Sequence, residues 1–149
     1  MPEHKLPRVF FDTSVVIAGS FSSKGASYIL MQLAGLTMLD GRVSADVRIE
    51  AERNITAKLP VALPAVRLLF RDVLKEGPAL LQEQIDSVAL YADTKDVVIL
   101  AAAVTQECHF LVTLNEKDFW PPTTMIKVMR PGDLLRTIRS LITQLVEEQ

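Results

Sequence analysis

The sequence predicts an α/β fold, a three-layer α/β/α sandwich with a central parallel sheet, and three observations lead to it. Short β-prone apolar runs alternate with stretches of helical spacing about 10–15 residues long, which is the pattern of βαβ units. One stretch, 97–104, is apolar on every side, as expected for a helix buried inside a fold. No repeat, low-complexity tract or linker interrupts the 149 residues, so we expect one domain spanning residues 1–149.

The expected elements follow from apolar spacing, helix caps and Gly or Pro breakers. The expected strands are Arg8–Phe11, a short candidate at Gly41–Ser44, Ser87–Tyr91, His109–Thr113 and Ile126–Met129. The expected helices are Ala26–Leu36, Ala45–Lys58, Ala65–Lys75, a helix opened by Asp93–Asp96 with its body at Val97–Val104, and Pro131 to about Val146. The segment Gly19–Gly25, rich in Gly and Ser, is interpreted as a loop.

The composition favours a protein with a sizeable core. It is 49% hydrophobic and 23% charged, and its longest apolar run, Val97–Val104, is far shorter than the ~20 residues of a membrane span. The amino end lacks the apolar stretch of a secretory signal. Cys108 is the only cysteine, which excludes an internal disulfide and favours a reducing compartment, so we expect a cytoplasmic protein. The net charge of −2 argues against a broad basic surface for nucleic acid but leaves local basic contacts open.

Acidic and amide side chains follow several of the expected strands, where ligands bind in open parallel sheets. Asp12 follows the first strand, Asp93 and Asp96 follow the third, and Asn115 with Asp118 follows the fourth. Carboxylates gathered in one cleft repel one another unless a cation neutralises them. Oxygen-only ligands suit Mg²⁺ or Mn²⁺, and a hard divalent ion can activate water and stabilise charge on a phosphoryl oxygen.

Each of these acids also has a purely structural alternative. Asp12 could start an Asx-type turn, and Asp93 could cap the helix that follows it. Asp96 is harder to explain as a solvated carboxylate, because it opens a helix expected to lie deep in the fold. Glu50 lies just off the edge of the apolar arc of its helix, and the residues alone do not distinguish it from a surface acid.

Four segments together resemble the signature blocks of PIN domains, in the family's order and over nearly the whole chain. They are Arg8-Val-Phe-Phe-Asp12-Thr-Ser14, Ser44-Ala-Asp-Val-Arg-Ile-Glu50, Asp93-Thr-Lys-Asp96-Val-Val-Ile-Leu-Ala-Ala-Ala and Phe110-Leu-Val-Thr113-Leu-Asn115-Glu-Lys-Asp118-Phe. The resemblance implies a Mg²⁺- or Mn²⁺-dependent endoribonuclease, as in the VapC-type toxins of toxin–antitoxin pairs. It further implies an RNA substrate, an antitoxin partner and a homodimer.

The resemblance also assigns roles to individual residues. Its four catalytic acids are Asp12, Glu50, Asp96 and Asp118, of which Asp12, Asp96 and Asp118 would hold metal. Its supporting polar residues around them are Ser14, Asp93, Thr113 and Asn115. Many family members carry an acid where Asn115 stands, which leaves open whether one ion or two are used.

Several other features have a possible role in binding. The phosphate-loop spacing is absent around Gly25, but Lys24 is a candidate phosphate contact because of its proximity to Asp12. Arg67, Arg71 and Lys75 form a basic stripe at helical spacing, either a solvated face or a contact for RNA. Lys95 and Lys117 flank two acids and are candidates for steering phosphate. A broad apolar stripe on the last helix, Leu134 to Leu145, would cover the sheet or contribute to a dimer.

Two other functions compete with the nuclease hypothesis. A PIN fold without activity could bind RNA or protein, and a metal titration with a nuclease assay would separate the two. A receiver-like phospho-acceptor also uses acids at strand ends and Mg²⁺. It would need a second acid beside Asp12 and a lysine just after a late strand, whereas Lys127 lies within one.

Overall fold

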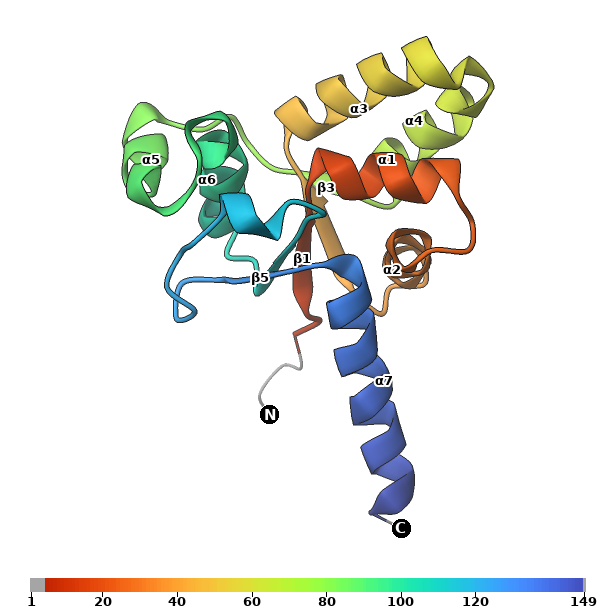
Figure 1. Ribbon diagram of the computed structural model, residues 1–149. Coiled ribbons are helices and arrows are strands. Elements are labelled where there is room, and N and C mark those ends of the chain that lie inside the picture. Colours follow the sequence, from red (N-terminus) through yellow and green to blue (C-terminus); the bar gives the residue numbers. More distant parts are fainter. Residues whose placement is uncertain (1–4, 149) are drawn as a thin grey trace.

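A five-stranded, fully parallel sheet forms the centre of the computed structural model, which describes residues 5–148 (Figure 1). Its strand order is β3-β2-β1-β4-β5, so the first strand of the chain is also the middle strand of the sheet. The strands are β1 Arg8–Phe11, β2 Asp40–Val43, β3 Lys75–Glu76, β4 Phe110–Val112 and β5 Lys127–Met129. Residue Val9 of β1 lies opposite Gly41 of β2 on one side and Phe110 of β4 on the other.

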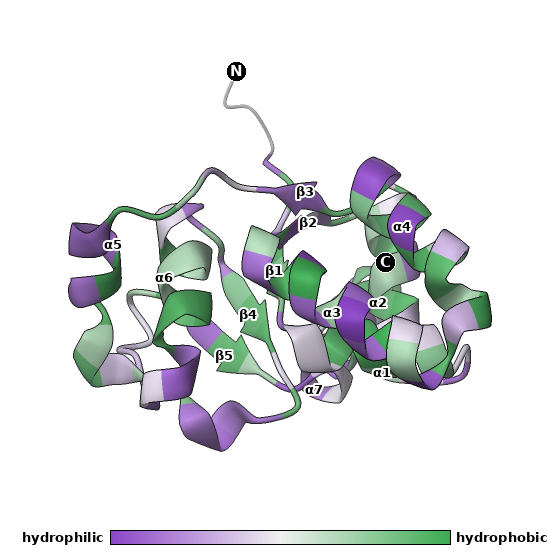
Figure 2. Cartoon of the chain, turned by 90° about the horizontal axis from the view of Figure 1, so that it is seen from above, coloured by the Kyte–Doolittle hydropathy of each residue, from purple (hydrophilic) through white to green (hydrophobic). Residues whose placement is uncertain are grey.

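Helices cover both faces of this sheet, which confirms the predicted three-layer α/β fold (Figures 1 and 2). On one side lie α5 and α6, and on the other lie α1 and α2, with α3 and α4 packed outside α1 and with α7 against α2. The α-helices are α1 Thr13–Phe21, α2 Ala26–Gly35, α3 Ala45–Lys58, α4 Leu63–Asp72, α5 Gln82–Asp86, α6 Val97–Thr105 and α7 Pro131–Glu147. The short 3₁₀ turns are η1 Pro60–Ala62, η2 Ala89–Tyr91, η3 Thr94–Asp96 and η4 Glu116–Asp118.

The core lies between these layers and explains the apolar run in the central strand β1. Val9, Phe10 and Phe11 of β1 are fully buried, as a strand covered on both faces requires. The predicted buried helix is confirmed as α6, in which Val97 and every residue from 99 to 103 are buried. The edge strand β3 contrasts with them, because both of its residues are exposed and hydrophilic (Figure 2).

The third predicted strand, Ser87–Tyr91, is wrong. This segment follows α5 and contains η2, with the Tyr91 amide donating to the Val88 carbonyl at 3.0 Å. Val88 is the one fully buried residue in it and Leu90 is 83% exposed, so the segment lacks the burial of a strand inside the sheet. The strand that fills the edge position is β3, whose Lys75 was predicted to end a helix; α4 stops at Asp72 instead.

The predicted loop Gly19–Gly25 is also partly wrong, because α1 continues through Phe21 and the loop begins at Ser22. Gly19 belongs to the packing of two helices. A Cβ there would overlap Met31 Cε and come within 3.2 Å of the Tyr28 backbone nitrogen on α2. A glycine that looks like a loop residue in the sequence therefore allows α1 and α2 to lie close together.

The apolar stripe on the last helix does not cover the sheet as predicted. Leu134 and Leu135 are buried at the start of α7, which packs against α2 there. Beyond Ile138 the helix projects from the body of the molecule (Figure 1). Its last apolar side chains are more than half exposed: Leu141 58%, Ile142 52%, Leu145 63% and Val146 70%.

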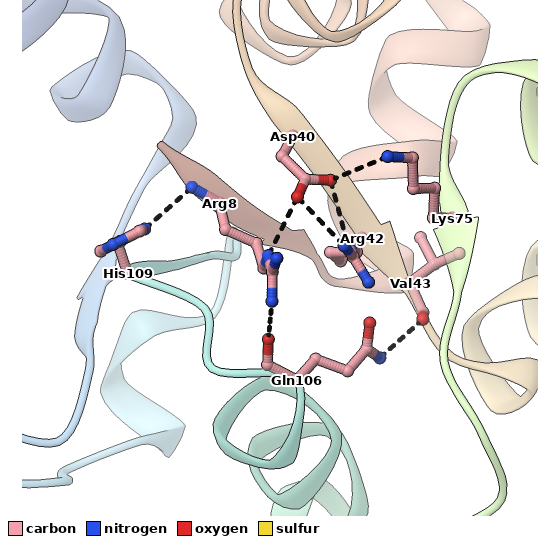
Figure 3. A network of polar contacts seen from close by, with 7 residues as sticks. All are labelled: Arg8, Asp40, Arg42, Val43, Lys75, Gln106 and His109. Carbon is pink, nitrogen blue, oxygen red and sulfur yellow. Dashed lines mark hydrogen bonds and ion pairs between the residues drawn. The ribbon is translucent and has the colours of Figure 1, made fainter. Parts of the chain in front are cut away.

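A polar network ties three strands to α6 at the amino end of the sheet (Figure 3). The Asp40 carboxylate accepts hydrogen bonds from Arg8 Nε and Arg42 Nε, each at 2.9 Å, and lies 3.8 Å from Lys75 Nζ. Arg8 also donates through Nη1 to the Gln106 carbonyl at the end of α6, at 2.6 Å. The Asp40 carboxylate thus interacts with cationic side chains from β1, β2 and β3.

Within residues 5–148, none of the helices is both long and apolar enough to cross a membrane.

Candidate acid site at the carboxyl ends of the strands

Asp12 is held in one orientation between the carboxyl ends of β1 and β4. It is only 7% exposed, and its backbone amide donates to the Val112 carbonyl at 3.1 Å. Its Oδ2 atom accepts from Thr113 Oγ1 at 2.7 Å and from Ser14 Oγ at 3.0 Å, and its Oδ1 accepts from the Thr13 amide at 2.8 Å. The predicted meeting of Asp12 with Ser14 and Thr113 is therefore present, because β1 and β4 are neighbours.

The electrostatics of Asp12 differ from those of an exposed turn residue. Burial raises the pKa of its carboxyl, and the hydrogen bonds from Thr113, Ser14 and Thr13 only partly offset this. The negative charge of Asp96 raises the pKa of Asp12 further, so the two acids are close enough to interact. A buried carboxylate beside a second one is an environment that favours a bound cation.

The segments that carry the other acids are joined by a short backbone connection. Ala92 forms an isolated antiparallel bridge with Phe119, and the Asp93 amide donates to the Asp118 carbonyl at 2.8 Å. Asp93 caps η3, since its Oδ1 accepts from the Lys95 amide at 3.3 Å. This bridge brings the segments that contain Asp96 and Asp118 together, although no strand precedes Asp93.

A lysine that the sequence analysis treated only as a possible phosphate contact lies within this group. Lys95 Nζ donates to Asp96 Oδ2 at 2.5 Å and to Asp118 Oδ2 at 2.8 Å. Hydrogen bonds from its ammonium to Asp118 and Asp96 raise the pKa of Lys95 well above its usual range. No spacing rule indicates such a contact, because it joins a residue to its neighbour and to another chain segment.

Glu50 and Asn115 lie at the margin of the site. Glu50 is exposed on α3 and lines a groove of about 380 Å³ together with Thr13, next to Asp12, and with Arg53 of its own helix. Asn115 is exposed before η4, and its backbone amide donates to Thr113 Oγ1 at 3.0 Å. Within residues 5–148, the side chains of Glu50 and Asn115 form no hydrogen bond with Asp12, Asp96 or Asp118.

The donor set fits a divalent cation that keeps part of its water shell. Among the residues that the structure describes, no three acidic, His or Cys side chains converge tightly enough to form a complete cage. Asp96 and Asp118 nevertheless already hold a cationic group between them, and Asp12 lies beside Asp96. Mg²⁺ is commonly bound through one or two carboxylates, waters and substrate phosphates, so an all-protein cage is not required.

The predicted RNA contacts lie away from this group. Lys24 follows the carboxyl end of α1, whereas Asp12 precedes its first residue; the nine residues of α1 separate them by about 14 Å. Lys24 therefore follows the end of α1 opposite to Asp12, and its contact with phosphate stays a prediction. Arg67 and Arg71 lie on α4, where Arg71 pairs with Asp72 at 2.9 Å. Lys75 belongs to β3, so the predicted helical stripe of three cations does not form.

Comparison with known proteins agrees with the fold described above. A family model described as "PIN domain" matches residues 8–117. No curated protein matches the chain. Among solved structures, VapBC2 from Rickettsia felis, bound to a DNA fragment from its promoter, is similar with a TM-score of 0.57 and 15% identity, over 83% of this chain and 98% of that one.

A second solved structure is VapC20 from Mycobacterium tuberculosis, a sarcin–ricin loop cleaving toxin. It is similar with a TM-score of 0.50 and 11% identity, over 69% of this chain and 86% of that one. At these identities the two structures agree with this chain in fold. The family model covers well over half of the chain, including Asp12, Glu50 and Asp96, and ends one residue before Asp118; the chain therefore belongs to the PIN domain family.

Proposed function

We propose that this protein is a Mg²⁺- or Mn²⁺-dependent endoribonuclease and the toxin of a toxin–antitoxin pair. The observation that carries the proposal is the pair of acids Asp96 and Asp118, which share one ammonium group, with the charge of Asp96 acting on the buried Asp12. VapC20, which shares the fold, is described as a toxin that cleaves the sarcin–ricin loop, an RNA target. A cytoplasmic location is part of the proposal, since Cys108 is buried and free.

In this mechanism Asp12, Asp96 and Asp118 would hold the cation, and Glu50 lines the groove from which RNA would approach. When bound, the cation supplies activation of water and stabilisation of charge on the phosphate. Thr113 and Ser14 keep Asp12 in position through its Oδ2 atom. Asp93 fixes the turn that presents Asp96, and Asn115 anchors its segment to Thr113.

We expect RNA cleavage to stop in excess chelator and to return when Mg²⁺ or Mn²⁺ is added back, because carboxylates alone do not generate a nucleophile from water at neutral pH. The measurement is cleavage of a labelled RNA by the purified protein, with the cation titrated after removal by EDTA. The control is Asp12→Asn, which keeps the shape of the side chain and removes one proposed ligand charge. Full activity in excess EDTA would contradict the metal mechanism.

An inactive PIN module that binds RNA or protein is the second candidate. It is favoured by one feature, the amide of Asn115 at a position where the resemblance to PIN domains leads us to expect an acid. The same titration separates the two candidates. A binding module would retain RNA in a gel-shift assay but leave it intact at every cation concentration.

The proposed partners are an antitoxin protein and a second copy of this chain. The similar VapBC2 structure includes both members of such a pair. For the second copy, the apolar positions Leu134, Ile138, Leu141 and Leu145 of α7 are spaced four, three and four residues apart. This is the spacing of a helix that packs along another helix. The exposed second half of α7 would then be covered in the dimer.

We expect the protein to sediment as a dimer at tens of micromolar and the double variant Leu141→Glu/Leu145→Glu to sediment as a monomer. Both side chains are more than half exposed, so the charges would disrupt the interface without disturbing the core. Val61→Glu is the matched control, since Val61 is 82% exposed on η1, away from α7. A parent protein that sediments only as a monomer would exclude the proposed dimer but would not contradict the proposed nuclease activity.

A further inference from the structure

Lys95 occupies an unusual position for a lysine that is 64% exposed. Its ammonium reaches back over its own turn to Asp96 and across to Asp118, which is 23 residues further along the chain. The two carboxylates are only 17% and 33% exposed, so the ammonium lies over partly buried negative charge. The aliphatic stem remains in solvent.

The neighbouring cations do not share this arrangement. Lys117 is exposed on η4, next to Asp118, and it forms no ion pair with another residue of the described part of the chain. Arg130 reaches the same loop but pairs with Glu116 at 3.1 Å. Lys95 is therefore the cation that bridges two of the proposed metal ligands.

A bridging ammonium and a divalent cation compete for the same carboxylate oxygens, because the two positive charges repel each other. Asp96 Oδ2 and Asp118 Oδ2 both face Lys95 Nζ, at 2.5 and 2.8 Å. Without the ammonium, Asp96, Asp118 and the nearby Asp12 would repel one another. With it, two of the acids stay close together in the absence of metal. A divalent ion that binds these two Oδ2 atoms would displace Lys95, whose flexible, exposed side chain can turn away into solvent.

We propose that Lys95 is an intramolecular counter-ion of the acid site, which keeps Asp96 and Asp118 together before metal binds and competes with Mg²⁺ or Mn²⁺ for them. This inference rests on the proposed function, since it takes these acids to be metal ligands. It adds that Lys95 changes the affinity of the acid site for the divalent cation. The concentration of divalent cation that fills the site is raised by the ion pairs that Lys95 must give up.

The first test is the affinity of the acid site for Mn²⁺ alone, measured by calorimetry and by the bound-ion EPR signal without RNA. We expect Lys95→Met, which keeps the length of the side chain and removes its charge, to bind Mn²⁺ about fivefold more tightly or better, as expected when two coupled ligands no longer compete. The metal-free variant should unfold at a lower temperature than the parent. Lys95→Arg should bring the Mn²⁺ affinity and the unfolding temperature of the metal-free protein back towards those of the parent.

Lys117→Met is the matched control, because it removes the same charge from the same surface without removing a bridge. A gain in Mn²⁺ affinity equal to that of Lys95→Met would show a general effect of charge and would overturn the proposal. Unchanged affinity in Lys95→Met would also overturn it. If that variant still cleaved RNA in a metal-dependent way, the proposed function would stand. If the parent protein neither binds Mn²⁺ nor cleaves RNA, both the proposed function and the proposed role of Lys95 are wrong.

The second test follows the release of Lys95 directly. Lysine acylation measured by mass spectrometry should become faster at Lys95 when saturating Mg²⁺ is added, because the amine leaves its two carboxylates. Labelling of Lys117 in the same sample is the internal reference and should change little. Slower or unchanged labelling of Lys95 with Mg²⁺ would mean that the lysine stays in place, and the competition would be excluded.

Discussion

Asp96→Asn should lower RNA cleavage by about two orders of magnitude or more while leaving the metal-free protein folded. The amide keeps the shape of the side chain but removes a charge from a site that already contains Asp12 and Asp118. It also weakens the bridge to Lys95, so the gain from reduced repulsion and the loss of an ion pair oppose each other. The net change in the free energy of unfolding without metal should stay within about 1 kcal/mol.

Thermal melts with and without Mg²⁺ should be recorded beside the cleavage assay. Mg²⁺ should stabilise the parent by mass action and the variant much less. The matched control is Asp46→Asn, since Asp46 is an exposed acid in the first turn of α3 and lies outside the acid site. An Asp96→Asn protein that cleaves RNA at the parent's rate would show that Asp96 is a structural acid, and the proposed site would lose its central ligand.

Asp40→Asn should reduce the free energy of unfolding by about 2 kcal/mol at pH 7. The figure lies below that for a fully buried ion pair, because the side chains of Arg8 and Arg42 are 29% and 21% exposed. Without the carboxylate charge, Arg8, Arg42 and Lys75 would face one another around a neutral amide. Burial opposes ionisation of Asp40, but the hydrogen bonds from Arg42 and Arg8 outweigh it and hold the pKa of its carboxyl below the usual value.

The pH dependence of this contribution follows from the lowered pKa. A carboxyl whose pKa is lower in the folded state stabilises the protein fully above its unfolded pKa of about 3.9. The contribution is lost as the pH falls through the folded-state pKa. Urea unfolding of parent and variant should therefore differ by the full amount at pH 7 and begin to converge only below about pH 4. Asp72→Asn, at an exposed acid paired with Arg71, should cost little at either pH.

The sequence predicts those parts of the site that depend on the order of parallel strands. Asp12 and Thr113 could be placed together because each directly follows an apolar run, and parallel strands end at one edge of a sheet. The same logic failed for Asp93 and Asp96. It needed a strand at Ser87–Tyr91, whereas the connection to Asp118 is a single bridge between Ala92 and Phe119. A bridge of one residue pair leaves no periodic pattern.

Two other features could not be predicted because they depend on contacts between side chains. Gly19 looks like a loop residue until Met31 is placed against it. Lys95 looks like an ordinary surface lysine until Asp118 is brought within its reach. Helix α1 was missed for a related reason. It is apolar on most of its surface, so the periodicity that marks an amphipathic helix is weak there.

The pairing of β1 with β4 has a consequence for the time course of synthesis. Asp12 accepts its hydrogen bond from Thr113, a residue 101 positions later, and the partners of β1 lie on both sides of it. A ribosome adds roughly 5–20 residues each second, so Asp118 is made roughly 5–20 s after Asp12. Until then β1 lacks its partner β4 or part of the segment that follows it, and Asp12 lacks at least one of the other acids of the site. A nascent chain therefore has no complete acid site, and the proposed cleavage activity begins only after Asp118 has been made.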